Sequence, residues 1–446
     1  MRRLGATCKA LGCARHVYQY KSLKSLYRGL ARNVEIPEPE FDTDYLCEVK
    51  YKPEIEKNIQ QRKGIGNISR VHELHNKLQT TCLSEENRRN VLEEFKKEAM
   101  QIPNKTCPLV ALYGDNPKII TVTGNKTKFD FQPKEFSEIT RMLHLIRTDN
   151  LSNLSGHKSY YLMGELAEME HALMWFTVKR LLAKKFKLIS VPDILPAQII
   201  ESCGMTTRGD RTQVYTLDEH LYKGEYCLSG TAEMALAGYL MNQVFHVTNL
   251  PLRLAAVSRC YRAETSGTLE ERGIYRVHQF TKVEMFAVTD CDSSAMLLEE
   301  FRELQEETFA MLGLHLQTLD MPPHELGAPA FRKYDIEAWM PGRQIFGEVS
   351  SCSDCTDYQS RRLNIKYQQR GSDSLLHAHT LNGTACAIPR MLIALLETHQ
   401  QADGTVTIPE ALQPYMKGKV TIGCQNIPKM KFVKSKHKEQ KHKNCD

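Results

Sequence analysis

The stretch that most restricts the fold is GIYRVHQFTKVEMF, residues 273–286, where aromatic and β-branched side chains alternate with charged ones. An extended chain sends successive side chains to opposite faces. One face of such a strand carries Arg276, His278, Phe280, Lys282 and Glu284. The other face carries Tyr275, Val277, Gln279, Thr281, Val283 and Met285. The charged face is either the wet side of an ordinary antiparallel strand or part of a site.

Strand patterns elsewhere in the chain do not alternate regularly with helical ones. Residues 250–264 and the stretch above predict two strands joined by a long loop that contains Ser266 and Gly267. Residues 344–359 predict another strand that ends in polar residues. Strands without intervening helices favour an α+β fold with a largely antiparallel sheet.

Further elements are predicted from residue patterns along the chain. We expect a helix over 134–149, a strand over 158–163, a long helix over 164–184 and an extended segment over 187–196 that contains Pro192. Residues 382–400 predict a turn that enters a helix.

The N-terminal region predicts a linker over 35–53 and then a helical hairpin. Apolar residues recur at helical spacing in two stripes, with Ser84 as the cap of the second helix. The stripes are Ile68, Val71, Leu74 and Leu78, and then Val91, Leu92, Phe95 and Ala99. Sequence alone leaves open whether these helices pack on the main domain or form an arm.

Charge is distributed unevenly. Residues 1–34 hold eight basic residues and no acid, which is typical of a mitochondrial transit peptide; the alternative is a basic arm that binds nucleic acid. Residues 417–446 form a Lys-rich tail with a net charge of +7, which leaves −9 for residues 35–416.

Several classes of protein are excluded or disfavoured by composition. The 14 cysteines are scattered over 446 residues, unlike a disulfide scaffold, and the single pair Cys352 and Cys355 is a weak zinc signal. No apolar run reaches the roughly 18 residues of a membrane span. No P-loop motif occurs, and GIGNIS at 64–69 fails the dinucleotide pattern at its last position.

Arginines, carboxylates and one aromatic gather at the predicted strand ends and at a helix start. Arg262 and Glu264 share a face, Arg272 follows in the loop, Phe280 and Glu284 share the charged face, and Arg390 opens the late helix. Arginine forks suit phosphate and an aromatic ring suits a base, so the set fits a nucleoside triphosphate. Glu348 and Ser351 offer the oxygen ligands that Mg²⁺ prefers. Taken singly, each residue also fits a surface ion pair.

Four segments resemble the motifs of class II aminoacyl-tRNA synthetases. YRAE (261–264), RGIYRVHQFTKVEMF (272–286) and NGTACAIPRMLIALLE (382–397) resemble motifs 2 and 3, and KLISVP (187–192) resembles motif 1, which forms the dimer interface in that class. The wording of TAE (231–233) and GEVSSCSDCTDYQSRR (347–362) is similar to seryl-tRNA synthetases, over about 120–416. The basic N-terminus and the ending match the animal mitochondrial type.

The resemblance implies roles for individual residues. It implies ATP bound with Arg262 on the α-phosphate, Glu264 at the adenine amino group, Arg272 on the terminal phosphate, and Phe280 and Arg390 on the two faces of adenine. Ala263, Val277, Val349 and Ser350 complete the implied ATP site, and Glu348 and Ser351 are the implied Mg²⁺ ligands. It implies a serine pocket of Thr231, Ala232, Glu233, Glu284 and Thr384, with Glu284 taking the hydroxyl and with Arg262, Glu284 and Arg390 as the catalytic set.

The resemblance also implies an organisation and partners. Residues 1–34 are then a transit peptide, 35–105 a linker and short tRNA-binding arm, 106–416 the catalytic domain and 417–446 a tail. The expected activity is ATP-dependent charging of mitochondrial tRNA(Ser) with L-serine in the mitochondrial matrix. We expect a homodimer through the region near Pro192, a seryl-synthetase-like paralogue as a candidate partner, and no membrane.

Two other functions remain open. One is a non-catalytic paralogue that binds RNA or the true enzyme, which would have lost the site residues kept here. The other is a class II ligase for another amino acid. Departures from the family pattern lie at Ala385 and Pro389, where Gly is usual, and at Asp354, where Asn is common.

Overall fold

The structure is a computed structural model that describes residues 35–80, 82–148, 151, 155–209, 212–220, 224–264 and 273–426. The predicted transit peptide, most of the Lys-rich tail and Arg272 lie outside the described residues. The fold below is that of one unit of the chain, Glu38–Asp446.

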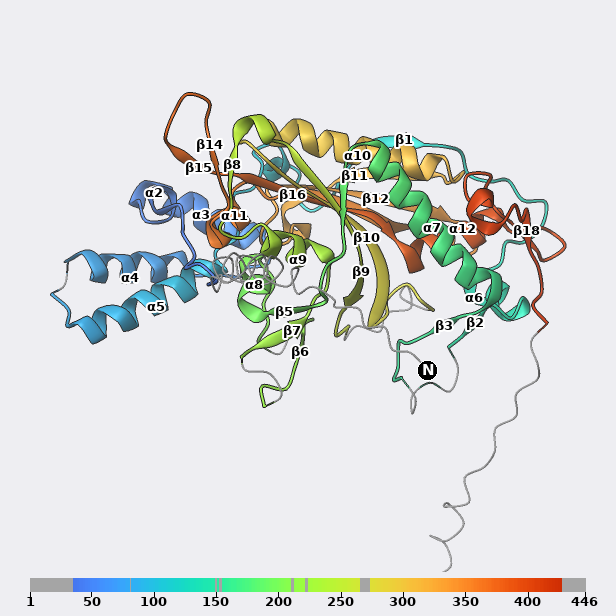
Figure 1. The fold of residues 1–446 in the computed structure, drawn as a ribbon, viewed down its shortest axis with the longest axis horizontal. Helices are drawn as coiled ribbons and strands as arrows, with labels where there is room; N and C mark the ends of the chain where they lie inside the picture. The colour runs from blue at the N-terminus through green and yellow to red at the C-terminus, as the bar shows by residue number, and fades with distance from the viewer. Residues whose placement is uncertain are drawn as a thin grey trace, which may run out of the picture. The chain divides into compact units, whose positions relative to one another are not determined.

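Helices occur throughout the described residues (Figure 1). The α-helices are α2 (Thr43–Leu46), α3 (Lys52–Gln61), α4 (Ile68–Thr80), α5 (Glu85–Gln101), α6 (Phe136–Met142), α7 (Gly164–Ala183), α8 (Ala197–Ser202), α9 (Ala232–Tyr239), α10 (Ser294–Ala310), α11 (Tyr358–Leu363) and α12 (Ile388–His399). Short 3₁₀ helices are η1 (Val49–Tyr51), η2 (Val110–Leu112), η3 (Val247–Asn249), η5 (Pro323–Glu325) and η6 (Gln413–Met416).

One large sheet organises the described residues. Its eight strands run in the order β1 (Lys118–Thr123), β11 (Leu316–Asp320), β12 (Arg332–Met340), β13 (Ile345–Asp354), β16 (His379–Ala387), β10 (Gln279–Thr289), β9 (Leu252–Tyr261) and β4 (Lys187–Ile189). Neighbouring strands are antiparallel except β4, which runs parallel to β9. The predicted α+β fold with a largely antiparallel sheet is therefore confirmed.

Smaller sheets surround the large one. They are formed by β2 (Ile146–Arg147) with β3 (Tyr161–Leu162); β5 (Ile194–Pro196), β7 (Tyr226–Leu228) and β6 (Tyr215–Thr216); β15 (Leu375–His377), β14 (Lys366–Gln368) and β8 (Val244–His246); and β17 (Val406–Thr407) with β18 (Thr421–Ile422).

Helices α7, α10 and α12 cover one face of the large sheet (Figure 1). Val283 and Met285 of β10 are fully buried in the same core as Leu173 of α7, Phe301 of α10 and Leu392 of α12. The alternation read from the sequence therefore holds within β10. The remaining face of that strand is free to build a site.

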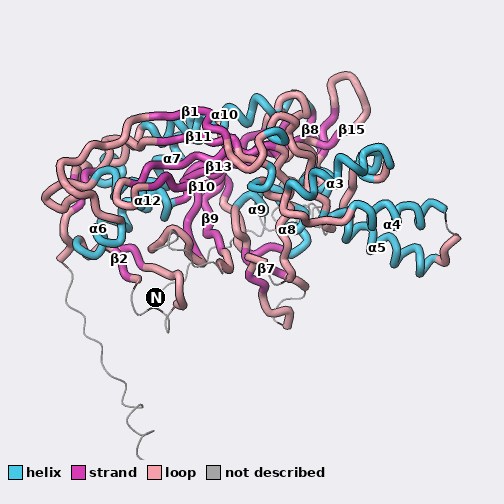
Figure 2. Tube along the Cα trace, turned by 180° about the vertical axis from the view of Figure 1, so that it is seen from behind, coloured by secondary structure: helices cyan, strands magenta, loops and turns pink. Residues whose placement is uncertain are grey.

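Helices α4 and α5 form the predicted hairpin and lie side by side, apart from the large sheet (Figure 2). The Ser84 hydroxyl caps α5 by accepting from the backbone N–H of Asn87. Val71, Leu74, Phe95 and Ala99 are buried in a small core of their own. Leu92, predicted to be part of this stripe, is exposed, because Val91 and Phe95 already fill that side of α5.

The hairpin is fastened to the sheet domain through the end of α3. Arg62 donates to the carbonyls of Asn104, at 2.7 Å, and of Ala328, at 3.3 Å. The Asn104 amide in turn donates to the carbonyls of Pro329 and Cys355, at 2.8 and 2.9 Å. The attachment is therefore made chiefly to main-chain oxygens.

Several predicted elements differ from the structure. Residues 43–51, within the expected linker, form α2 and η1, and Leu46 joins the hairpin core. The helix expected over 134–149 is only α6, because β2 follows it. Residues 382–387 are not a turn but the end of β16, which leads directly into α12.

The first residues of the predicted tail belong to the folded domain. β18 pairs with β17, and the Lys419 ammonium lies 3.0 Å from Glu165 and 2.8 Å from Glu168 of α7. None of the described helices is both long and apolar enough to cross a membrane.

Candidate active site

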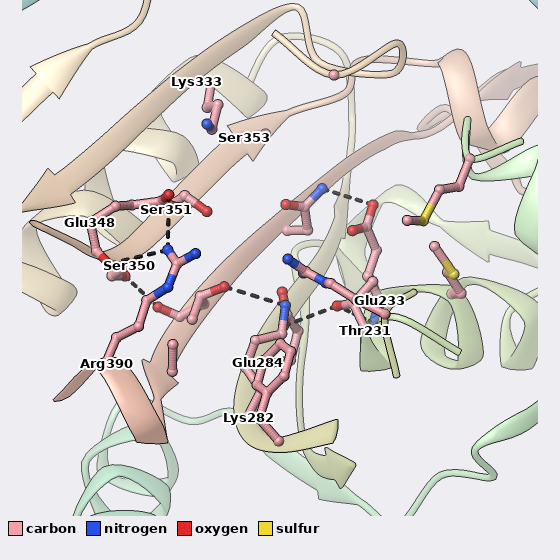
Figure 3. A pocket seen from close by; sticks show the side chains of 18 of the residues that line it. Thr231, Glu233, Lys282, Glu284, Lys333, Glu348, Ser350, Ser351, Ser353 and Arg390 are labelled. Atoms are coloured by element: carbon pink, nitrogen blue, oxygen red, sulfur yellow. Dashed lines mark hydrogen bonds and ion pairs between the residues drawn. The ribbon is translucent and has the colours of Figure 1, made fainter. Parts of the chain in front are cut away.

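A cavity of about 350 Å³ opens on the sheet face that α7, α10 and α12 leave uncovered. Side chains from β10, β13 and β16, from the start of α9 and from α12 line it (Figure 3). The loop of residues 327–330 forms another part of its wall. The cavity has two polar ends, with Arg262 and Phe280 between them.

The first end is built where β10 and β16 pair. Glu284 lies opposite Thr384 in the antiparallel register, and Ala385 forms a bulge before pairing resumes at Cys386. Thr231, the N-cap of α9, donates its hydroxyl to Glu284 Oε2 at 3.2 Å. The Lys282 ammonium lies 2.5 Å from the same oxygen, and both side chains are almost fully buried.

A second carboxylate, Glu233, lies at the same end. It accepts hydrogen bonds from the side-chain amides of Gln359 and Asn382, at 2.6 and 2.9 Å. Burial, and then the nearby charge of Glu284, raise the pKa of Glu233 to about 7. Burial also raises the pKa of Glu284, while Lys282 opposes that rise. This end is therefore a dry pocket of alternating charges.

The second end is built on β13 and α12. Arg390 donates to Glu348 Oε2 at 3.0 Å, and its guanidinium lies 4.5 Å from the centre of the Tyr275 ring. Burial would raise the pKa of Glu348, but Arg390 and Lys333 outweigh that effect and hold the pKa below its usual value. Glu348 is consequently an ionised carboxylate facing the cavity.

A bulge brings Glu348 and Ser351 to one side of β13. Residues three apart point to opposite faces in a regular strand. Here Glu337 pairs with Glu348 and Ile336 with Ser350, so Val349 is the extra residue and the alternation is reset. The predicted magnesium ligands thus share a face.

The donors at this end fit Mg²⁺. Glu348 is ionised, and the Ser351 hydroxyl makes no hydrogen bond to any described residue. Over the described ranges, no group of three or more His, Cys, Asp or Glu residues forms a metal cage, and this includes Cys352 and Cys355. Magnesium commonly takes few protein ligands and completes its shell with water and phosphate oxygens.

The middle of the cavity holds a cation over an aromatic ring. The Arg262 guanidinium lies 5.3 Å from the centre of the Phe280 ring. The Arg262 backbone is held by His278, whose carbonyl accepts from the Arg262 N–H at 3.0 Å. Glu264 is buried and lies 3.4 Å from Arg276.

The part of the chain that builds this cavity matches a known protein family. The model described as tRNA synthetase class II core domain (G, H, P, S and T) matches residues 215–399. A serine–tRNA ligase from Rubrobacter xylanophilus is 41% identical over 342 residues, which is 76% of this chain and 79% of that protein. The chain belongs to the seryl-tRNA synthetase family.

Within the seryl-tRNA synthetase family, mitochondrial members are similar to this chain. The mitochondrial serine–tRNA ligases of Bos taurus and Mus musculus are 49% and 48% identical over 327 residues, 73% of this chain. The chain spans 63% of the length of these two relatives. The resemblance to the animal mitochondrial type is confirmed at this level.

Solved seryl-tRNA synthetases have the same fold. A seryl-tRNA synthetase from Pyrococcus horikoshii complexed with ATP has a TM-score of 0.72 at 27% identity, covering 92% of this chain and 94% of that chain. The cytoplasmic enzyme from Naegleria fowleri in complex with AMP has a TM-score of 0.74 at 26% identity, covering 87% and 100%. The predicted class II fold is thus confirmed.

Most of the residues predicted from the family pattern line the cavity. They are Thr231, Glu233, Arg262, Glu264, Val277, Phe280, Glu284, Glu348, Val349, Ser350, Ser351, Thr384 and Arg390. Ala232 and Ala263 do not line it: Ala232 is buried within α9, and the Ala263 N–H donates to the Gln213 carbonyl. Arg272 lies outside the described residues.

Polar cavity residues to which the sequence assigned no substrate role include Lys282, Lys333 and Asn382. Lys282 lies on the charged face of β10, but the family resemblance implied no substrate role for it. Asn382 and Lys333 carried no signal of their own, because each reaches the cavity only through strand pairing.

The structure accommodates the three residues that depart from the family pattern. Pro389 occupies the first turn of α12, where proline costs no hydrogen bond. Ala385 is the buried bulge residue. Asp354 accepts from the Thr356 N–H at 2.8 Å.

Proposed function

We propose that this protein activates L-serine with ATP to form seryl-adenylate and then transfers serine to mitochondrial tRNA(Ser). The observation that carries the proposal is one cavity with a buried carboxylate pocket at one end and a partly solvated end that holds Arg390 and Lys333 at the other. An amino acid and a triphosphate placed in the two ends would meet at Arg262. The names of the related enzymes support the same pair of substrates.

At the first end we expect Glu233 to attract the serine ammonium group and Glu284 to accept from the hydroxyl. Thr231 and Thr384 supply hydroxyl groups beside them. A site built to bond a hydroxyl rejects an analogue that lacks it, by a factor on the order of 10⁴. Alanine should therefore be refused strongly, and threonine only by the size of the pocket.

The first chemical step would join a serine carboxylate oxygen to the α-phosphorus and break the bond to the pyrophosphate group. Both reactants are anions, so positioning and charge stabilisation supply most of the catalysis. Arg262 lies between the two ends and would neutralise charge at the α-phosphate, while Phe280 stacks on adenine. Magnesium held by Glu348 and Ser351 would supply positive charge to the leaving pyrophosphate.

Arg390 has a changing partner in this scheme. In the structure it pairs with Glu348 and lies over Tyr275. We expect a bound nucleotide to draw the Arg390 guanidinium toward its adenine ring and its phosphates. Glu348 is then released for the cation.

The hairpin α4–α5 is the candidate tRNA-binding arm. Arg70, Lys77 and Lys96 already pair with carboxylates. Arg88 and Arg89 are exposed near the tip and have no ion pair among the described residues. Changing both to Glu should reduce tRNA charging while leaving pyrophosphate exchange unchanged.

A homodimer through the region around Pro192 is supported by exposed apolar side chains. Leu188 lies on the edge strand β4, Ile194 lies on β5, and Trp175 and Leu182 lie seven residues apart on α7. A large exposed apolar patch marks an interaction site. A mitochondrial matrix location is supported by the names of the mitochondrial relatives and by the basic N-terminus.

The deciding experiment is ATP–pyrophosphate exchange by the chain lacking residues 1–34, with serine, alanine and threonine compared. We expect exchange with serine and little with alanine. A folded protein without exchange would refute the enzymatic function and favour a non-catalytic paralogue. Exchange with another amino acid instead would identify a different ligase.

A further inference from the structure

Among the residues that the structure describes, Lys282 is a cation at the amino-acid end of the cavity whose role the proposed reaction leaves unexplained. It lies two residues before Glu284 on β10, so both side chains point from the same face. Its ammonium lies 2.5 Å from Glu284 Oε2 and donates to the Thr384 hydroxyl at 3.4 Å. Lys282 therefore touches Glu284, the expected partner of the substrate hydroxyl (both labelled in Figure 3), and Thr384 beside it.

These contacts fix the direction of the hydrogen bonds. An ammonium group has three hydrogens to donate and no lone pair. The Thr384 oxygen must accept from it, which leaves the Thr384 hydrogen to donate elsewhere. Glu284 Oε2 accepts from Lys282 and from Thr231, whereas Oε1 accepts no hydrogen bond from any residue in the described ranges.

The same lysine sets the charge of the pocket. With Glu233 and Glu284 ionised, Lys282 leaves one net negative charge. That charge matches the single positive charge of an amino-acid ammonium group. Without the lysine, two buried carboxylates would face each other, and like charges at short range disfavour ionisation of both.

We infer that Lys282 is the positioning residue that makes the pocket select a hydroxyl-bearing amino acid. It holds Glu284 Oε1 as an acceptor and Thr384 as a donor, so that a hydroxyl is bound through both its hydrogen and a lone pair. This inference rests on the proposed serine activation. It adds the residue that gives the pocket its selectivity.

The role of Lys282 affects the rejection of alanine more than it affects the chemical step. Alanine offers neither donor nor acceptor and leaves both groups unpaired in a dry pocket, which is where discrimination arises. Removing Lys282 lets Glu284 bind a proton and Thr384 turn. The pocket then loses its preference without losing the parts that handle the adenylate.

The test is the Lys282→Met variant in ATP–pyrophosphate exchange with serine and with alanine. We expect kcat/KM for serine to fall by about 10- to 100-fold, the loss of one or two charge-assisted contacts. For alanine it should change by less than about 3-fold, and KM for ATP should stay the same. Equal fold losses in kcat/KM for serine and alanine, which leave their ratio unchanged, would overturn the inference.

A matched control is Lys333→Met. Lys333 is also buried against a carboxylate, 2.8 Å from Asp335, but at the opposite end of the cavity. Its loss should raise KM for ATP and leave the serine-to-alanine ratio as in the unmodified protein. A comparable change of that ratio would show that any buried lysine of the cavity has the same effect, against the inference.

A double-mutant cycle keeps the test valid even if Lys282→Met folds poorly. Glu284→Gln removes the charge of the acid alone and leaves Lys282 unneutralised. Glu284→Gln with Lys282→Met removes both charges, which proteins usually tolerate better than a lone buried charge. We expect little further loss of serine activation in the double variant. A further loss of 10-fold or more would show that Lys282 acts independently of Glu284.

The unmodified protein separates the two proposals. Exchange with serine combined with an unchanged ratio in the variants refutes only the role of Lys282. Absence of exchange with serine in the unmodified protein refutes the proposed function, and the role of Lys282 with it.

Discussion

The two ends of the cavity each hold a carboxylate paired with a cation, but water reaches them to very different extents. The side chains of Glu284 and Lys282 are 2% and 7% exposed. Those of Glu348 and Arg390 are 38% and 17% exposed. Similar chemistry is thus present in a dry and in a partly solvated environment.

The difference suggests what each end does. Charges interact more strongly where water is excluded, and an unpaired group is then most costly. The dry end is suited to reject a substrate that lacks one polar atom. The open end can break its ion pair cheaply, so Arg390 and Glu348 are able to take a nucleotide and a cation instead of each other.

The largest expected difference between the two ends is in their contribution to the free energy of unfolding. Glu284→Ala leaves Lys282 buried without its carboxylate partner and should lower the free energy of unfolding by about 3–5 kcal/mol. Glu348→Ala should lower it by no more than about 1 kcal/mol, because the lost pair is partly solvated. Urea unfolding followed by circular dichroism measures both. Equal losses would show that the exposure of the pairs has no energetic consequence.

The second-largest expected difference between the two ends is in substrate affinity. Arg390→Ala removes the cation from the open end and should raise KM for ATP by about 10- to 100-fold, a range typical for loss of a charge-assisted contact. KM for serine should change by less than about 3-fold, because Arg390 does not reach the dry end. Steady-state exchange kinetics with each substrate varied give both values. Equal increases would contradict separate ends.

pH should affect the binding of serine at the dry end. Burial and Glu284 raise the pKa of Glu233 to about 7, and the ionised form is the one that attracts an ammonium group. KM for serine should therefore rise as pH falls below 7, by nearly tenfold per unit at the acidic limit.

The titratable and charged groups that face Glu233 determine which control variant is needed. These are Glu284 and Lys282, with the Cys203 and Cys355 thiols, whose pKa values burial raises so that they stay neutral. In Glu233→Gln the slope of KM for serine below pH 7 should disappear. A slope that persists in this variant would assign the titration to another group.

The smallest effect concerns single hydroxyls. Thr231→Val removes one donor to Glu284 and should lower kcat/KM for serine about fivefold, the value of about 1 kcal/mol for one hydrogen bond. Ser351→Ala should leave the free energy of unfolding unchanged within about 0.5 kcal/mol, because that hydroxyl has no described partner. Thermal unfolding and exchange assays check the pair, and a marked loss of stability in Ser351→Ala would contradict the description of the open end.

The sequence was sufficient where a side chain's position depends on its own strand. Alternation along β10 predicted that Phe280, Lys282 and Glu284 share a face, because side-chain direction has a period of two. The strand begins at Gln279 rather than at 273, since Gly273, at a φ of +72°, belongs to the preceding turn. The family pattern then predicted which of these residues would bind substrate.

The sequence was insufficient where position depends on a partner strand. Glu348 and Ser351 share a face only because Val349 is bulged against β12, and a bulge exists only as a relation between two strands. The role of Lys282 likewise depends on Thr384, which lies on β16. A single sequence contains both residues but not their register.

The attachment of the hairpin has a consequence for how such a protein can change over generations. Arg62 and Asn104 hold mainly the carbonyls of Gly327, Ala328, Pro329 and Cys355, and every amino acid supplies a carbonyl. The side chains of that loop can therefore be exchanged without loosening the joint. Mutation is free to adjust the cavity wall on one side while the hairpin stays anchored on the other.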